Sequence, residues 1–258
     1  MLRAARRLQR RKDRQSARRF LAEGRQAISE ALHRPGAVAQ LIVADISVDR
    51  HRDLIRTASN CGVDTVLAPE RAVVELAHTV TSQGLVAVCE MVDVATDEAL
   101  GGSPRLVVLC DQVRDPGNLG TVIRCADAFG ADAVLVSRDS VDLYNAKTVR
   151  ATTGSLFHLP IAVGVDLAEA AAQARDVGLQ VFGADAHAAC SVNDLAHSGE
   201  LTKPTLWVVG NEAWGLPAEH TTLLDRLVAL PRYGQAESLN LSTAAAVLLY
   251  ASATAQRS

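Results

Sequence analysis

Short apolar runs alternate with segments of helical periodicity along most of the chain. In the second half, the runs at 105–111, 131–137, 156–163, 179–185 and 206–210 have the length and Val/Leu content of buried strands. Helical patterns at 121–130 and 167–178 separate some of them, and each ends at a glycine. This alternation predicts a mostly parallel sheet that is covered by helices on both faces.

The first half predicts a smaller α/β unit. Strand patterns at 38–44, 63–68 and 85–92 surround a helical pattern at 50–60, and Ala27, Ile28, Ala31 and Leu32 follow helical spacing before Pro35. Residues 93–104 are acidic and end in Gly-Gly-Ser-Pro, which indicates a linker. We therefore expect a basic flexible arm at 1–16, a small domain at 17–92, a linker at 93–104 and a larger domain at 105–258.

Charge is distributed unevenly along the 258 residues. The net charge is only −3, but residues 1–34 hold eleven Arg or Lys and three Asp or Glu, a local charge of +8. A basic segment on an acidic body favours a polyanionic partner, although a solvated tail has the same composition. Five cysteines without CxxC spacing argue against a zinc site or a disulfide framework and favour a reducing cytoplasm. No apolar run reaches the length of a membrane span.

Three loops in the second half combine glycine with polar side chains directly after apolar runs. The first, Asp111 to Arg124, contains DPGNLG and opens a helix; the second, Val209 to Pro217, reads VGNEAWGLP; the third, Leu230 to Asn240, reads LPRYGQAESLN. Open parallel sheets bind ligands at the carboxyl ends of their strands, so each loop is a candidate site. Singly, each loop is also an ordinary strand-to-helix connection. None has the GxGxxG or Walker pattern of a nucleotide-binding loop.

Together and in this order, the three loops resemble the three motifs of the SpoU (TrmH-type) family of RNA ribose 2′-O-methyltransferases. The motifs are NLGTVIR at 118–124, GNEAWGL at 210–216 and LPRYGQAESLN at 230–240. The resemblance covers about residues 105–255. It implies an α/β-knot (trefoil-knotted) methyltransferase domain, S-adenosylmethionine as cofactor, a homodimer and no metal. The first half, particularly residues 18–32, resembles the small ribosomal-protein-like (L30e-like) domain that precedes the catalytic domain in many members.

The resemblance also implies roles for individual residues. The catalytic set would be Arg124, Asn118, Glu212, Ser238 and Asn240. The cofactor contacts would come from Val209, Gly210, Leu230, Leu239 and Asn240. The RNA contacts would come from Arg18, Arg19, Arg25, Lys147 and Arg150, which as exposed basic residues are as readily explained by a solvated surface. Ribosomal RNA is favoured over transfer RNA because of the ribosomal-protein-like first domain.

The chemistry of the residues agrees with these roles. A ribose hydroxyl is a poor nucleophile, so methyl transfer needs its oxygen aligned and relieved of its proton. A guanidinium is effectively always protonated, so we expect Arg124 to clamp phosphate and stabilise developing negative charge. The proton would pass to a substrate phosphate, to Glu212 or to the arginine itself.

Trp214 departs from the motif, because many members have a small or polar residue there. It is either a core residue or a platform for a nucleobase.

Two other classes of function remain open from the sequence. A non-catalytic RNA-binding protein would use the basic arm and carry a degenerate second half. An α/β enzyme acting on a small acidic metabolite would use Arg124 as its anion clamp, but this reading leaves the basic arm unexplained.

Overall fold

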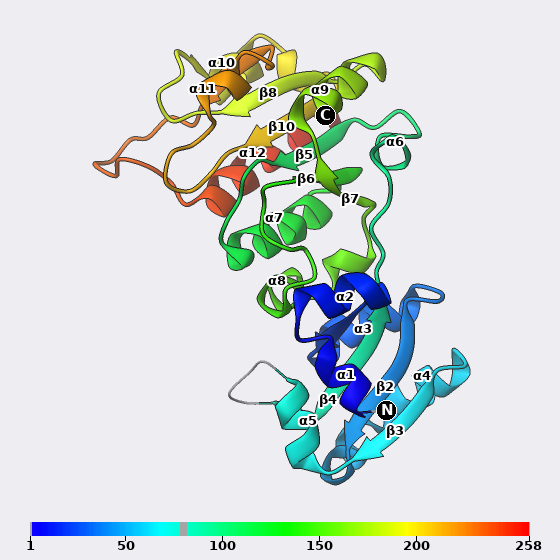
Figure 1. The fold of residues 1–258 in the computed structure, drawn as a ribbon. Helices are drawn as coiled ribbons and strands as arrows, with labels where there is room; N and C mark the ends of the chain where they lie inside the picture. Colours follow the sequence, from blue (N-terminus) through cyan, green and yellow to red (C-terminus); the bar gives the residue numbers. More distant parts are fainter. Residues whose placement is uncertain (1, 78–81, 258) are drawn as a thin grey trace. The chain divides into compact units, whose positions relative to one another are not determined.

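The computed structural model describes residues 2–77 and 82–257, and its chain divides into two compact units. Unit 1 consists of residues 1–92 and 142–158, and unit 2 of residues 93–141 and 159–258. Residues 1, 78–81 and 258 fall inside the predicted domains but lie outside the described residues. The described helices include none that is long and apolar enough to cross a membrane. Figure 1 shows both units and labels most of their helices and strands.

Unit 1 is built on a four-stranded sheet of order β1-β4-β2-β3, in which β4 is antiparallel to both neighbours. Its strands are β1 (Arg19–Glu23), β2 (Val38–Ala44), β3 (Asp64–Ala68) and β4 (Leu85–Glu90). Its helices are α1 (Leu2–Arg7), α2 (Arg11–Ala17), α3 (Arg25–His33), α4 (Arg52–Asn60), α5 (Glu70–Leu76) and α8 (Ala146–Thr152), and short 3₁₀ turns are η1 (Asp45–Ser47), η2 (Asp49–His51) and η3 (Ser155–Phe157).

The expectation of a flexible arm at 1–16 differs from the structure, in which these residues form α1 and α2. Ala5 of α1 and Leu8, directly after it, are buried in an apolar cluster with Ile42 and Val86 of the sheet. Arg14 of α2 is buried as well, and its guanidinium donates to Leu8 O at 3.1 Å and Asp142 Oδ2 at 2.5 Å. The small apolar residues between the arginines therefore fix this segment, which composition alone did not reveal.

The segment 142–158 also differs from the predicted boundaries, because it completes unit 1 rather than the larger domain. Its Tyr144 and Phe157 rings lie 4.6 Å and 6.2 Å from the fully buried Phe20 ring of β1. In the same unit, the Arg150 guanidinium forms an ion pair with Glu23 at the end of β1. Aromatic packing of this kind dominates small cores, so the first unit needs residues from a distant part of the chain.

Unit 2 is a seven-stranded sheet of order β7-β6-β5-β10-β8-β11-β9, and all its described strand pairs are parallel. Its strands are β5 (Leu106–Cys110), β6 (Ala133–Ser137), β7 (Ile161–Val165), β8 (Gln180–Ala184), β9 (Cys190–Ser191), β10 (Thr205–Val209) and β11 (Arg226–Ala229). Its helices are α6 (Thr96–Ala99), α7 (Pro116–Ala128), α9 (Leu167–Asp176), α10 (Val192–His197), α11 (Ala218–Thr221) and α12 (Leu241–Arg257), with the 3₁₀ turn η4 (Glu200–Thr202).

Alternate residues of the central strands face opposite helical layers. Val208 of β10 belongs to the core cluster beneath α9. The preceding residue, Trp207, faces the other side of the sheet, where its Nε1 donates to Ser252 Oγ of α12 at 2.8 Å. On that second face α12 lies against α7, where the Tyr250 and Phe129 rings meet edge to face at 5.6 Å. Both faces are thus covered, which explains why β5, β6 and β10 are buried at every position.

The predicted linker at 93–104 is part of unit 2. Val94 forms a parallel bridge with Ala162 at the edge of the sheet, and α6 follows directly. Ala99 and Leu100 are buried in the core cluster beneath α9. The acidic composition of this stretch therefore reflects its exposed side, while Ala99 and Leu100 fix it to the sheet.

Candidate functional site

The candidate site is a cavity of about 360 Å³ at the carboxyl edge of the sheet of unit 2. Its walls come from the residues that end or follow β8, β10 and β11. Of the predicted cofactor and catalytic residues, six line it: Val209, Gly210, Glu212, Leu230, Ser238 and Leu239. The second and third motifs therefore converge on one cavity, as the ligand-binding edge of an open parallel sheet requires.

Gly210 is required by the close approach of the chain to itself. The turn that follows is closed by two hydrogen bonds between Asn211 and Gly215, each 2.9 Å long. Gly215 has a φ of +71°, in the left-handed region that favours glycine. A Cβ added to Gly210 would lie 2.5 Å from the carbonyl carbon and oxygen of Gly215 and 2.6 Å from Leu216 N. Any side chain at 210 would thus push the wall of the cavity out of place.

The first motif opens α7 with a side-chain cap. Asp115 precedes the helix and accepts a hydrogen bond from Asn118 N at 2.8 Å, and Pro116 occupies the first helical turn, where its missing N–H costs nothing. This cap fixes the first turn of α7 and leaves the Asn118 side chain available for the second motif.

Glu212 joins the second motif to the first. Its Oε1 accepts from Asn118 Nδ2 at 3.0 Å and Asp115 N at 3.2 Å, and its Oε2 accepts from Arg114 N at 3.3 Å. Burial raises the pKa of Glu212, but the donated hydrogen bonds from Asn118 and from backbone N–H groups outweigh it and hold the pKa below its ordinary value. Glu212 is therefore an ionised hydrogen-bond acceptor that organises the first motif. Its lowered pKa also makes it a weaker base.

Asn240 joins the third motif to the same network. Its Nδ2 donates to Asn118 Oδ1 at 3.0 Å, while its Oδ1 accepts from Ser242 N at 2.9 Å and Ser242 Oγ at 2.6 Å at the start of α12. The order Glu212–Asn118–Asn240 links all three motifs through side chains that are far apart in the sequence. Each amide is oriented by its partners, so the network leaves its members little rotational freedom.

Two further predicted catalytic residues lie outside this network. Ser238 lines the cavity and is exposed. Arg124 is exposed on α7, two turns after Asn118, and does not line the cavity. Asn118 and Asn240 are also absent from the lining and connect to it through Glu212.

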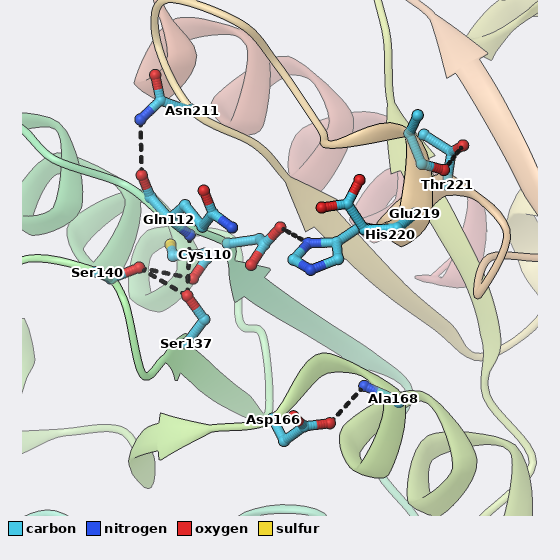
Figure 2. Close-up of polar contacts among 12 residues, drawn as sticks. Cys110, Gln112, Ser137, Ser140, Asp166, Ala168, Asn211, Glu219, His220 and Thr221 are labelled. Carbon is cyan, nitrogen blue, oxygen red and sulfur yellow. Dashed lines mark hydrogen bonds and ion pairs between the residues drawn. The ribbon is translucent and has the colours of Figure 1, made fainter.

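The base of the first loop is held to the second motif and to β6. Gln112 has a φ of +53°, its N–H donates to Ser137 Oγ at 2.9 Å, and its carbonyl accepts from Asn211 Nδ2 at 2.8 Å (Figure 2). Ser137 and Ser140 share a hydrogen bond of 3.0 Å beside it. These contacts offset the strain of a left-handed non-glycine residue and fix the path of the loop.

The sequence did not single out the loop that follows β8, although it forms one wall of the cavity. Asp185, Ala186 and His187 line the cavity, and His187 N donates to Asp185 Oδ1 at 2.6 Å. Arg232 of the third motif donates to Ala186 O at 3.3 Å and to Glu237 O, so it ties the two loops together. The position of Asp185 at the end of a predicted strand was the signal that could have indicated it.

The predicted RNA-binding residues lie in unit 1, and three of them already have acidic partners. Arg19 pairs with Glu90 at 2.7 Å, Arg25 pairs with Asp53, and the less exposed Arg150 pairs with Glu23. Arg18 ends α2 with a φ of +52°, and Lys147 is exposed in the first turn of α8. In the described part of the chain, no group of three or more His, Cys, Asp or Glu residues is arranged to hold a metal.

The sequence and the fold match proteins of known class. The sequence profile of the SpoU rRNA Methylase family matches residues 105–250, and that of the MRM3-like substrate binding domain matches residues 1–87. The 23S rRNA (guanosine(2553)-2′-O)-methyltransferase RlmP of Bacillus subtilis is 36% identical over 239 residues, which are 93% of this chain and 90% of that protein.

Solved structures of SpoU and rRNA methyltransferases have the same fold. The SpoU methyltransferase AviRb of Streptomyces viridochromogenes, in complex with the cofactor AdoMet, superimposes with a TM-score of 0.86 at 31% identity and covers 100% of this chain and 98% of its own. The AdoMet-bound rRNA methyltransferase of Sinorhizobium meliloti has a TM-score of 0.84 at 28% identity, covering 97% and 93%.

The protein is thus a methyltransferase of the α/β-knot class, with a small α/β domain before the knot. Within that class, the chain belongs to the SpoU rRNA methylase family. The predicted resemblance is confirmed, and with it an S-adenosylmethionine-dependent RNA ribose 2′-O-methyltransferase.

Proposed function

We propose that this enzyme methylates a ribose 2′-hydroxyl of large-subunit ribosomal RNA in the cytoplasm. The observation that carries the proposal is the network Glu212–Asn118–Asn240, which brings three separate motifs to the edge of one cavity. The RNA class is supported by relatives that are named 23S rRNA methyltransferases and align along most of this chain. The finding that the chain is a family member removes the support for a non-catalytic protein or a metabolite enzyme.

The cavity fits S-adenosylmethionine in its size and its lining. Val209, Leu216, Val228, Leu230 and Leu239 supply apolar wall, and the close backbone packing at Gly210 leaves a smooth edge without a side chain. The loops at 210–216 and 230–239, whose residues line the cavity, would supply the polar contacts. When bound there, the cofactor supplies an electrophilic methyl group on a sulfonium, which needs no metal.

We assign the residues of the network to alignment rather than to proton transfer. Glu212 is held ionised by its donors, and its lowered pKa makes it a weak base. Asn118 and Asn240 each have one amide group directed by a neighbour, so they are fixed dipoles at the site. Such preorganised groups stabilise charge without reorganising during the reaction. This leaves a substrate phosphate as the acceptor of the hydroxyl proton.

We assign Arg124 to the RNA phosphate and to the charge that develops on the ribose oxygen. The planar guanidinium can bind two phosphate oxygens at once. Because Arg124 does not line the cavity of its own chain, we further propose a homodimer in which a second copy brings this arginine to the site. Exposed apolar residues on α12, Val247 and Tyr250, fit a contact between copies.

Unit 1 is proposed to hold the RNA through phosphates. The apolar side of α1 packs on the sheet, so its arginines and Arg11 of α2 project from an ordered surface. The exposed basic residues of this surface are Arg3, Arg6, Arg7, Arg10, Arg11, Lys12 and Arg18. Contacts of this kind add affinity and orientation and carry little sequence information.

The test is methyl transfer from labelled S-adenosylmethionine to ribosomal RNA by the Arg124→Ala variant. We expect transfer to fall by at least about 100-fold, because one lost charge-stabilising donor costs that much in other enzymes. Cofactor binding, measured by calorimetry, should stay within error of the wild type. Arg138→Ala, which removes another exposed arginine of unit 2, is the matched control. Near-normal turnover of Arg124→Ala would overturn the assignment.

A further inference from the structure

A buried carboxylate lies at the end of β5, outside the network described above. Asp111 is 1% exposed, and its N–H donates to Val209 O at 2.8 Å, so it continues the pairing of β5 with β10 by one residue. A carboxylate in such a position is destabilising unless a donor compensates for the lost water. The first motif begins only a few residues later.

The donor is His220 of α11. Its Nδ1 lies 2.6 Å from Asp111 Oδ2, and its side chain is 23% exposed. A carboxylate accepts hydrogen bonds, so we assign the tautomer in which Nδ1 donates to Asp111. Figure 2 shows the imidazole reaching from its helix towards the end of β5. His220 follows Leu216 and Pro217 closely, and Leu216 lines the cofactor cavity.

The segment that follows β10, residues 211–220, is therefore held at both ends by two adjacent residues after β5, Asp111 and Gln112. At its start, Asn211 Nδ2 donates to Gln112 O at 2.8 Å; at its end, His220 donates to Asp111. Between these two anchors lie Glu212 and the wall that closes on Gly210. A loop held at one end only would sample more conformations, and ordering it would consume part of the binding free energy of a ligand.

We propose that the Asp111–His220 pair is a positioning pair, which holds the loop at 211–217 in its cofactor-binding conformation. Neither residue contacts the reacting atoms. The pair lowers the dissociation constant of S-adenosylmethionine by keeping the cavity formed before the cofactor arrives. The inference rests on the cofactor site of the proposed function and does not depend on which RNA is methylated.

The test compares three substitutions in the full-length protein by calorimetry with S-adenosylmethionine alone. His220→Ala should raise the dissociation constant roughly tenfold, which corresponds to the loss of one charge-assisted hydrogen bond. His220→Asn, whose amide can donate from near the Nδ1 position, should restore most of the affinity. His197→Ala, which removes another histidine of unit 2 at the end of α10, should change nothing.

Two further measurements distinguish a positioning role of the pair from a role in the stability of the fold alone. In steady-state methylation assays, His220→Ala should raise the KM for the cofactor about as much as the dissociation constant, while kcat at saturating cofactor stays within about twofold. In a double-mutant cycle, Asp111→Asn with His220→Ala should weaken binding no further than His220→Ala alone. Wild-type cofactor affinity in folded His220→Ala, or failure of His220→Asn to recover affinity, would overturn the proposal. Because calorimetry needs no RNA, a failure to methylate ribosomal RNA would leave this test intact.

Discussion

Replacing Gly210 by alanine perturbs the cofactor cavity with a single methyl group. The added Cβ would lie 2.5 Å from two backbone atoms of Gly215 and 2.6 Å from Leu216 N. Ordinary contact begins near 3.4 Å, so the opposing backbone must retreat by about 0.9 Å. Two hydrogen bonds between Asn211 and Gly215 resist that movement. The wall formed by Leu216 would move with the backbone.

The magnitude follows from the cost of overpacking, which is about 1–3 kcal/mol in well-packed interiors. A loss of that size in the cofactor-bound conformation weakens binding by roughly 5- to 150-fold. For a chain of this size, 1 kcal/mol lowers Tm by roughly 2–4 °C. We therefore expect Gly210→Ala to bind S-adenosylmethionine roughly 5- to 150-fold more weakly and to melt several degrees lower.

The assay is calorimetry with S-adenosylmethionine, together with a thermal melt of the same sample. Gly234→Ala is the matched control, because Gly234 lies in the third motif and a Cβ there would meet nothing within 4 Å. The control should keep both its affinity and its Tm. Wild-type affinity in Gly210→Ala would refute the claim that close backbone packing shapes the cavity.

Three other predictions concern separate features. Because the pKa of Glu212 is lowered in the fold, its carboxylate stabilises the protein above the unfolded pKa of about 4.5, and this contribution is lost as pH falls through the folded value. Glu212→Gln should therefore melt at a lower temperature than the wild type near pH 7, and the difference in Tm should shrink towards pH 3. A difference in Tm that stayed constant across thermal melts at several pH values would contradict this prediction. Trp214 lines the cavity and is 58% exposed, so we expect Trp214→Ala to raise the KM for RNA roughly tenfold through the loss of one stacked base. Trp214→Phe should recover part of the lost affinity for RNA, and an unchanged KM for RNA in Trp214→Ala would exclude stacking. Arg150→Ala removes the ion pair with the largely buried Glu23, so it should lower Tm by several degrees with little direct effect on RNA affinity. The reverse pattern in melts and filter-binding would show that Arg150 is an RNA contact.

Periodicity predicted the parallel sheet of unit 2 well because its strands are buried on both faces. A strand such as Leu106–Cys110 has no polar position to confuse the pattern. The strand at 19–23 was missed, because its apolar stretch is short and merges with the helix that follows. Its burial depends on Tyr144 and Phe157, more than one hundred residues away, and local patterns carry no such information.

The motifs predicted which residues belong to the site, but not how they connect. Glu212, Asn118 and Asn240 were expected as separate polar groups, and the structure joins them in one network. The Asp111–His220 pair spans 109 positions and belongs to no motif. β10 inserts between β5 and β8 in the sheet, which brings these residues together, and strand order is set by tertiary packing rather than by sequence pattern.

The position and chemistry of the methyl group test the central claim most directly. Total RNA from cells with and without this protein would be digested, and 2′-O-methylated nucleotides would be mapped as sites that resist alkaline cleavage. We predict one site in large-subunit ribosomal RNA that is lost without the protein and restored by the purified enzyme with labelled S-adenosylmethionine. A label found on a base, or identical 2′-O-methylation maps in the two strains, would contradict the account.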